Sequence, residues 1–137
     1  MKASAALAVG KWEEATYDQV SPEVKMTKAS VEYTFSGEME GKGSVEYLMY
    51  YSHVDAKDQH KSTASYFGLM RFVGRLAGKE GSFVMKDIGA FQAGAAISAL
   101  QIGEGSGTGS LLGITGTASY RADANGSRFE LKFELPS

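Results

Sequence analysis

In three stretches of this chain, side chains of one kind occupy every second position. This period of two constrains the possible folds more than any other feature of the sequence. Val31, Tyr33 and Phe35 are separated by polar residues. Residues 45–51 and 128–135 show the same period, the latter with charged residues between apolar ones. Because successive residues of a β-strand face opposite ways, each stretch predicts a strand with one face toward a core.

Glycine-rich turns divide the chain into strands of this kind. The sequence has 17 glycines and only two prolines, and glycines at 37–43 and 78–81 lie between apolar runs. Asn125-Gly126 precedes the last run, and this pair favours tight turns because both residues tolerate positive φ. The spacing predicts about eight strands and no convincing helix, with a loop or one helical turn at 16–23 and 55–61.

Such a sheet must protect its edge strands, and a closed barrel is the arrangement that removes them. Glycines inside the expected strands, at 68, 74, 89 and 94, favour the strong bending that a barrel requires. We therefore predict an all-β fold, a small antiparallel β-barrel of about eight strands, with a β-sandwich as the alternative. The length of 137 residues fits a single domain over residues 1–137.

Composition excludes several classes of protein. Fourteen Lys and Arg against 16 Asp and Glu give a net charge of −2, which argues against a nucleic-acid partner. No apolar run approaches the roughly 20 residues of a membrane helix, so no membrane partner is expected. The absence of cysteine excludes disulfides and thiolate metal sites and fits a cytoplasmic location. Residues 1–10 predict a first strand, with a cleaved leader of a secreted protein as the alternative.

A glycine run at 103–110, Gly-Glu-Gly-Ser-Gly-Thr-Gly-Ser, has the composition of a phosphate-binding loop. It lacks the Lys-Ser or Lys-Thr pair that contacts phosphate, and no helical pattern follows it. We therefore interpret it as a flexible connection between two barrel strands.

Four short motifs in order resemble a bacterial family known as domain of unknown function 3224. They are Phe35-Ser36-Gly37, the run 45–49, Gly81-Ser82-Phe83 and the Gly-Ser-Gly-Thr-Gly run at 105–109. The resemblance covers nearly the whole chain. It departs at Met70, where an acidic or polar residue is expected, so no acidic role is carried over to that position.

That family is similar in fold to the allene oxide cyclase barrel, a small antiparallel β-barrel shared by cyclases and isomerases of apolar substrates. The resemblance implies this barrel, but it does not imply the reaction, because one fold hosts many functions.

Glu46 and Tyr50 are candidates for acid/base catalysis, because they share one face of the strand at 45–51. A carboxylate in an apolar lumen has a raised pKa and can move a proton. The alternative is an exposed Glu46 beside Glu32 on the outside of the sheet, which is where most glutamates lie.

Arg71 is the third catalytic candidate. It lies in the run 67–73, which is apolar on both faces, so we expect the outer face to be covered by a second subunit or a ligand. A buried charge requires a partner, and Glu46 comes near Arg71 if the strands at 37–51 and 62–76 are adjacent. The alternative role for the two is a structural ion pair.

Five residues are candidates for ligand binding. Aromatic rings with a polar atom suit a pocket wall, although the same residues also serve as core or as subunit contacts. Asp87 is either an inward polar group or the partner of Lys86 near the rim, and one face of its strand also carries Phe91. The candidates are Trp12, Tyr33, Tyr47, Asp87 and Phe91.

We expect no metal and no cofactor. His53, Asp55, Asp58 and His60 lie close in sequence, but lysines at 57 and 61 indicate a solvated loop rather than a metal site. Both histidines of the chain lie in this loop, which makes a Ser-His-Asp triad improbable.

Three functions agree with these observations. The first is a barrel whose lumen binds a small apolar or aromatic metabolite, with or without cofactor-independent cyclase or isomerase activity. The second is a non-catalytic carrier barrel. The third is an assembly module, because the two-sided apolar run at 67–73 suggests a homo-oligomer.

Overall fold

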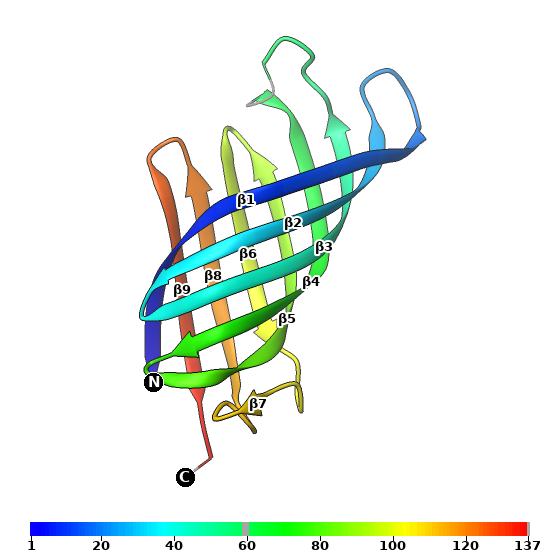
Figure 1. Ribbon diagram of the computed structural model, residues 1–137. Coiled ribbons are helices and arrows are strands. Elements are labelled where there is room, and N and C mark those ends of the chain that lie inside the picture. Colours follow the sequence, from blue (N-terminus) through cyan, green and yellow to red (C-terminus); the bar gives the residue numbers. More distant parts are fainter. Residues whose placement is uncertain (59–60, 137) are drawn as a thin grey trace.

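Antiparallel pairing of segments next to each other in sequence builds nearly the whole molecule (Figure 1). The computed structural model describes residues 1–58 and 61–136. The strands in these ranges are β1 (Lys2–Gln19), β2 (Lys25–Gly37), β3 (Met39–His53), β4 (Thr63–Leu76), β5 (Lys79–Gln92), β6 (Ala95–Ile102), β7 (Thr108–Gly109), β8 (Thr115–Asp123) and β9 (Gly126–Glu134). No helix in the described ranges has the length and apolarity needed to cross a membrane.

Eight of these strands close into a ring, in the order β1-β2-β3-β4-β5-β6-β8-β9, with β9 pairing back onto β1. Every pair is antiparallel. The predicted eight-stranded barrel and the predicted first strand are confirmed, and closure of the ring excludes the sandwich.

The ring is uneven because its closing seam is short. Strand β1 pairs with β9 only from Lys2 to Ala5, whereas its pairing with β2 continues to Gln19. Beyond Ala5 the Ser127 hydroxyl bridges to the backbone of Leu7, donating to its carbonyl at 2.8 Å and accepting from its amide at 2.9 Å. The far half of β1 then diverges from β9, so the barrel widens toward that end.

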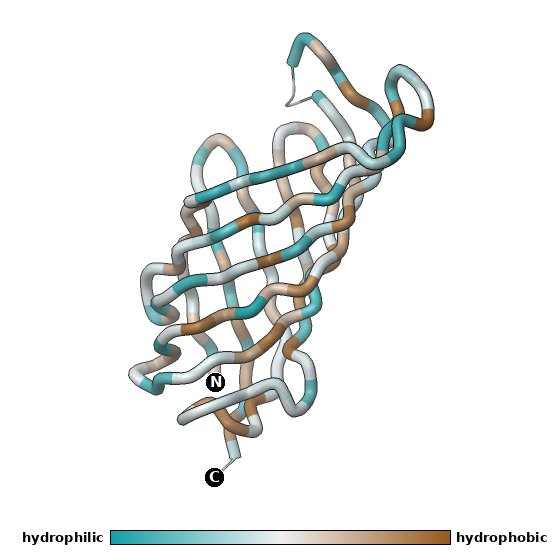
Figure 2. Tube along the Cα trace, turned by 45° about the vertical axis from the view of Figure 1, so that its right-hand side comes forward, coloured by the Kyte–Doolittle hydropathy of each residue, from teal (hydrophilic) through white to brown (hydrophobic). Residues whose placement is uncertain are grey.

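The period of two decides which side chains enter the barrel. Val31, Tyr33 and Phe35 are buried in the core, whereas Glu32 between them is exposed. Strands β3 and β9 follow the same rule, and Figure 2 shows apolar and polar positions alternating along the strands. The predicted division of each strand into a core face and a second face is confirmed, and the structure decides which face points inward.

One end of the lumen is filled by phenylalanine rings. Phe35 lies 5.1 Å from Phe72 and 5.2 Å from Phe129 between ring centroids, and Phe72 lies 5.3 Å from Phe83. All four rings are at most 3% exposed. Edge-to-face and tilted contacts of this kind add to the burial of apolar surface, so this half is a packed core.

The glycine run closes that packed end. Thr108 and Gly109 of β7 pair with Ser82 and Gly81 of β5, where β5 has no further partner in β6. The Ser106 hydroxyl donates to the carbonyl of Gly103 at 2.6 Å and accepts from the amide of Val84 at 3.1 Å. The run does connect two ring strands, β6 and β8. These hydrogen bonds and the pairing of β7 hold the run against β5.

A β-bulge at Gly10 changes which residues of β1 face inward. Before it, Ala5 and Leu7 are buried; after it, Trp12 and Glu14 point toward the lumen opposite Val31 and Ala29. One extra residue in a strand reverses the side on which all later side chains lie. The bulge therefore brings polar residues into the lumen at the wide end.

Truncating the phenylalanine core should cost much of the stability of the fold. Phe72→Ala removes a fully buried ring and should lower the free energy of unfolding by about 3–5 kcal/mol. Tyr17→Ala is the control, because Tyr17 is also an aromatic residue of a strand but is 56% exposed. Urea unfolding followed by circular dichroism measures both. Equal losses in the two variants would contradict this account of the core.

Candidate functional site

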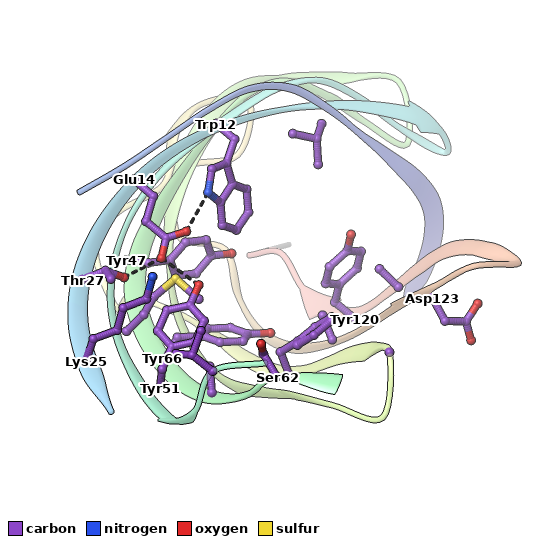
Figure 3. A pocket seen from close by; sticks show the side chains of 18 of the residues that line it. Trp12, Glu14, Lys25, Thr27, Tyr47, Tyr51, Ser62, Tyr66, Tyr120 and Asp123 are labelled. Carbon is purple, nitrogen blue, oxygen red and sulfur yellow. Dashed lines mark hydrogen bonds between the residues drawn. The ribbon is translucent and has the colours of Figure 1, made fainter. Parts of the chain in front are cut away.

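The half of the barrel opposite β7 is hollow. A cavity of about 700 Å³ opens at the wide end, and Figure 3 looks into it. Its wall is formed by residues of β1 to β6 and β8 and of the adjoining loops, among them Val9, Trp12, Glu14, Lys25, Thr27, Met49, Tyr51, Ala64, Phe91, Ala96 and Ala122. The lumen is therefore packed at one end and open at the other.

Four tyrosines separate the cavity from the packed core. Tyr33, Tyr47, Tyr66 and Tyr120 come from four different strands and are each between 4% and 8% exposed. Their rings pack edge to face, with centroids 5.1 Å apart for Tyr47 and Tyr66 and 6.1 Å apart for Tyr33 and Tyr120. We call these four residues the tyrosine floor. Their rings add to the apolar core, while their hydroxyls bring polar atoms to the base of the cavity.

The hydroxyl of Tyr47 reaches across a whole strand to a buried carboxylate. Tyr47, Gly68 and Asp87 lie in register on β3, β4 and β5, and the Tyr47 hydroxyl donates to Oδ2 of Asp87 at 2.8 Å. A β-carbon on Gly68 would collide with the carbonyl oxygen of Glu46 and lie 2.9 Å from the Tyr47 ring. The bond exists because the residue between its two partners has no side chain.

The same arrangement occurs once more, one strand further round the ring. Tyr66, Gly89 and Ser98 lie in register on β4, β5 and β6, and the hydroxyls of Tyr66 and Ser98 are 2.6 Å apart. A β-carbon on Gly89 would lie 2.6 Å from both of these oxygens. Glycines expected from the sequence to bend the barrel thus also make room for polar contacts beneath the cavity.

Asp87 is the most unusual group of the site. It is 1% exposed, and its Oδ1 has no hydrogen-bond partner within residues 1–58 and 61–136. Burial raises the pKa of the Asp87 carboxyl, and the hydroxyls of Tyr47 and Ser98 oppose that rise to a lesser degree. Burial also raises the pKa of Tyr33 and Tyr47, and that of Tyr66 to about 12, so the floor stays neutral.

A second polar group lies at the mouth. Glu14 accepts from the indole of Trp12 at 2.9 Å and from the hydroxyls of Thr27 and Tyr51, both at 2.7 Å (Figure 3). Burial and this carboxylate together raise the pKa of Tyr51. The ammonium of Lys25 lies 5.0 Å from the centroid of the Tyr51 ring, within the range of a cation–π contact. Three donors thus hold the Glu14 carboxylate in one orientation.

The structure brings together the five residues predicted to bind a ligand. Trp12, Tyr33, Tyr47 and Phe91 line the cavity, and Asp87 lies beneath it, bonded to Tyr47. Asp87 therefore takes the inward alternative, which the sequence left open. Binding by these residues stays a prediction.

The three residues predicted to be catalytic lie on the other side of the sheet. Glu46, Tyr50 and Arg71 are exposed on the outer face, because their neighbours Val45, Tyr47 and Met49 on β3 and Met70 and Phe72 on β4 take the inner one. Glu46 accepts from the Ser30 hydroxyl at 2.6 Å, and Arg71 donates to the Ser82 hydroxyl at 3.4 Å. The lumenal placement expected of Glu46 is thus corrected, and catalysis on a ligand in the cavity does not fit any of the three.

Sequence reasoning missed Glu14 and two residues of the floor. Glu14 lies beyond the bulge at Gly10, so simple alternation from the start of β1 assigns it to the outer face. Tyr66 was one of many aromatic residues without a distinguishing signal, and Tyr120 follows the weakly apolar run 115–119.

Within the described ranges, no three His, Asp or Glu side chains are grouped as a metal site. His60, part of the loop considered above, lies outside those ranges. Asp55 accepts hydrogen bonds from the backbone amides of Lys57 and Asp58, both at 3.0 Å.

Comparison with known proteins identifies relatives without an assigned activity. The family model described as "Protein of unknown function (DUF3224)" matches residues 3–135. The crystal structure of a DUF3224-family protein with unknown function from Shewanella oneidensis MR-1 is 23% identical, and the match covers 100% of this chain and 98% of that one with a TM-score of 0.75. Comparison with curated proteins gave no match. At this identity the solved structure shows a shared fold, and the likeness to allene oxide cyclase stays a prediction.

The buried carboxyl should make stability depend on pH, and Asp87→Asn should remove that dependence. The folded state holds the Asp87 proton to a higher pH than the unfolded chain, where the pKa is near 3.8. As the pH rises above that value, the unfolded state releases the proton first, so the free energy of unfolding falls until the folded pKa is passed. Urea unfolding across this range measures the difference between the variant and the natural protein.

Asp18→Asn is the control, since Asp18 is exposed at the end of β1. It should keep the pH profile of the natural protein. If the free energy of unfolding changed with pH in the same way for the natural protein and for Asp87→Asn, the Asp87 carboxyl would have the same pKa in the folded and unfolded states. That outcome would contradict this prediction.

Proposed function

The chain belongs to the DUF3224 family, and we propose that it binds a small, largely apolar or aromatic molecule in the open half of its barrel. The observation that carries this proposal is the cavity of about 700 Å³ above the tyrosine floor. Ligand pockets typically enclose about 300–1,000 Å³ and combine apolar walls with a few convergent polar groups. Both features are found here.

The contrast between the two halves of the barrel supports this proposal. Phenylalanines fill one half completely, whereas the other half has aromatic rings around an opening. A chain selected for stability alone gains from filling its core, because an unfilled cavity loses contacts. An open, aromatic-lined half is more readily explained by a molecule that occupies it.

The polar groups indicate how such a ligand would be oriented. Its apolar body fits between Trp12, Phe91 and Met49, with one polar atom directed at the hydroxyls of the floor. A second polar atom would meet Lys25 and the fixed Glu14 carboxylate at the mouth. A molecule with an aromatic body and a polar group at one or both ends suits this arrangement.

We favour a binding or carrier role over an enzymatic one. The cyclase or isomerase activity suggested by the resemblance needs a proton donor or acceptor in the lumen, and Glu46, Tyr50 and Arg71 face outward. Proton transfer to a ligand would instead fall to Tyr47 and Asp87. Binding requires no such step and rests on the cavity alone.

Filling the cavity should weaken binding. Trp12 is the only tryptophan of the chain and lines the cavity, so its single indole N–H signal in an NMR spectrum reports occupancy. Acetophenone and 1-phenylethanol, two small aromatic probes, should shift this signal saturably. Ala96→Phe places a ring in the cavity and should weaken both affinities about tenfold or more, a loss of about 1.4 kcal/mol.

Ala99→Phe is the matched control, because Ala99 lies on the same strand with its side chain outside. It should bind both probes as the natural protein does. Neither probe giving a saturable shift, together with native mass spectra that show no retained small molecule, would contradict the proposal.

A further inference from the structure

We propose that Asp87 sets the hydrogen-bond polarity of the tyrosine floor, so that the cavity prefers a ligand carbonyl when Asp87 is protonated and a ligand hydroxyl when it is ionised. This inference rests on the proposed function and adds to it the chemical class of the ligand's inner polar atom. Three residues carry it, namely Tyr33 on β2, Tyr47 on β3 and Asp87 on β5.

The three side chains form a hydrogen-bonded chain that ends at the cavity. Oδ2 of Asp87 lies 2.8 Å from the Tyr47 hydroxyl, which lies 3.4 Å from the Tyr33 hydroxyl. Tyr33 and Tyr47 both line the cavity. A phenol has one proton to donate and lone pairs with which to accept, so the donors of this chain can all point either toward Asp87 or away from it.

The charge of Asp87 decides between these two directions. An ionised carboxylate only accepts, so Tyr47 donates to it, Tyr33 donates to Tyr47, and Tyr33 presents lone pairs to the ligand. A proton on Oδ2 reverses every donor, and Tyr33 then directs its O–H at the ligand. Oδ2 lies 2.8 Å from the Tyr47 hydroxyl oxygen, so a proton carried on Oδ2 has an acceptor already in place.

Among the ionisable side chains packed together here, Asp87 is the one that changes charge. The ionisable side chains packed around it are Tyr33 from β2, Tyr47 from β3, Tyr66 from β4 and Tyr120 from β8. Burial raises the pKa of each phenol, so all four remain neutral while the carboxyl titrates. Strand β6 adds Ser98, which does not titrate.

The test compares the affinities of acetophenone, which only accepts, and 1-phenylethanol, which also donates, from about pH 4 to about pH 9. Neither probe titrates in this range. The ratio of acetophenone to 1-phenylethanol affinity should fall roughly fivefold as Asp87 ionises, since one hydrogen bond is exchanged. The Trp12 indole signal measures both affinities.

Two variants test whether the effect of pH on ligand preference passes through the chain of hydroxyls. Asp87→Asn has no proton to lose and Tyr33→Phe has no terminal hydroxyl, so both should give a ratio independent of pH. A constant ratio in the natural protein, or a changing ratio in either variant, would overturn the inference. Binding of neither probe would instead remove the proposed function and this inference with it. As a check without ligand, the infrared band of a protonated carboxyl should appear on acidification and be missing in Asp87→Asn.

A different observation concerns the outside of the barrel. Leu48, Phe67 and Ile88 form one row across β3, β4 and β5, and all three point outward. Phe67 and Leu69 are each 58% exposed and Ile88 is 66% exposed. Contiguous apolar surface of this kind is uncommon on monomeric proteins and marks interaction sites.

Charges beside this row match a second copy of the same chain. In the adjacent row of cross-strand neighbours, Leu69 on β4 lies between Glu46 on β3 and Lys86 on β5. A two-fold axis parallel to the strands places β3 of one copy over β5 of the other. Each Glu46 then faces a Lys86, with apolar side chains between the two pairs, as a self-complementary interface requires. From this symmetry we infer that the face forms a homodimer.

Charge reversal tests the dimer. Size-exclusion chromatography with light scattering should show a dimer for the natural protein, and Glu46→Lys should raise its dissociation constant roughly tenfold or more, because like charges then face each other. Combining Glu46→Lys with Lys86→Glu should restore the dimer. Glu32→Lys on the outer face of β2 is the control and should have no effect. A natural protein that stays monomeric at its highest soluble concentration, or a double variant without restoration, would overturn the inference.

Discussion

Close packing of Phe35, Phe72, Phe83 and Phe129 supports the rest of this structure. The four rings come from β2, β4, β5 and β9, so their mutual burial stabilises the ring as a whole and not only the hairpin of β4 and β5. The closing seam between β1 and β9 is short. With one half of the barrel held by this core, the other half can remain open without loss of the fold.

The open half depends on two places where a side chain is missing. Gly68 and Gly89 allow the hydroxyls of Tyr47 and Tyr66 to span a neighbouring strand and meet Asp87 and Ser98. Buried polar groups are costly unless they are hydrogen-bonded, so these contacts let tyrosines stand where phenylalanines would otherwise be expected. The base of the cavity is therefore polar, although almost no solvent reaches it.

Much of the fold, but less of the site, was predictable from the sequence. The alternation at 30–35 and 128–135 correctly separated the two faces of each strand, because each strand there continues without a bulge. Glu46 shows the limit of this reasoning. Its inner and outer placements differ by one residue of register, and its neighbour Leu48, apolar but exposed, blurs the pattern. In β1 the bulge at Gly10 reverses the pattern, which hid Glu14.

The sequence by itself determined an antiparallel all-β chain, because side-chain period and turn composition are local properties. It left open whether the sheet closes and which face of each strand points inward. Only the tertiary structure decided that Tyr47 meets Asp87, that Glu14 is held at the mouth, and that one half of the lumen is hollow. Those outcomes depend on register between strands, on a single bulge and on the volume enclosed by eight strands together, and none of these is a property of any one segment.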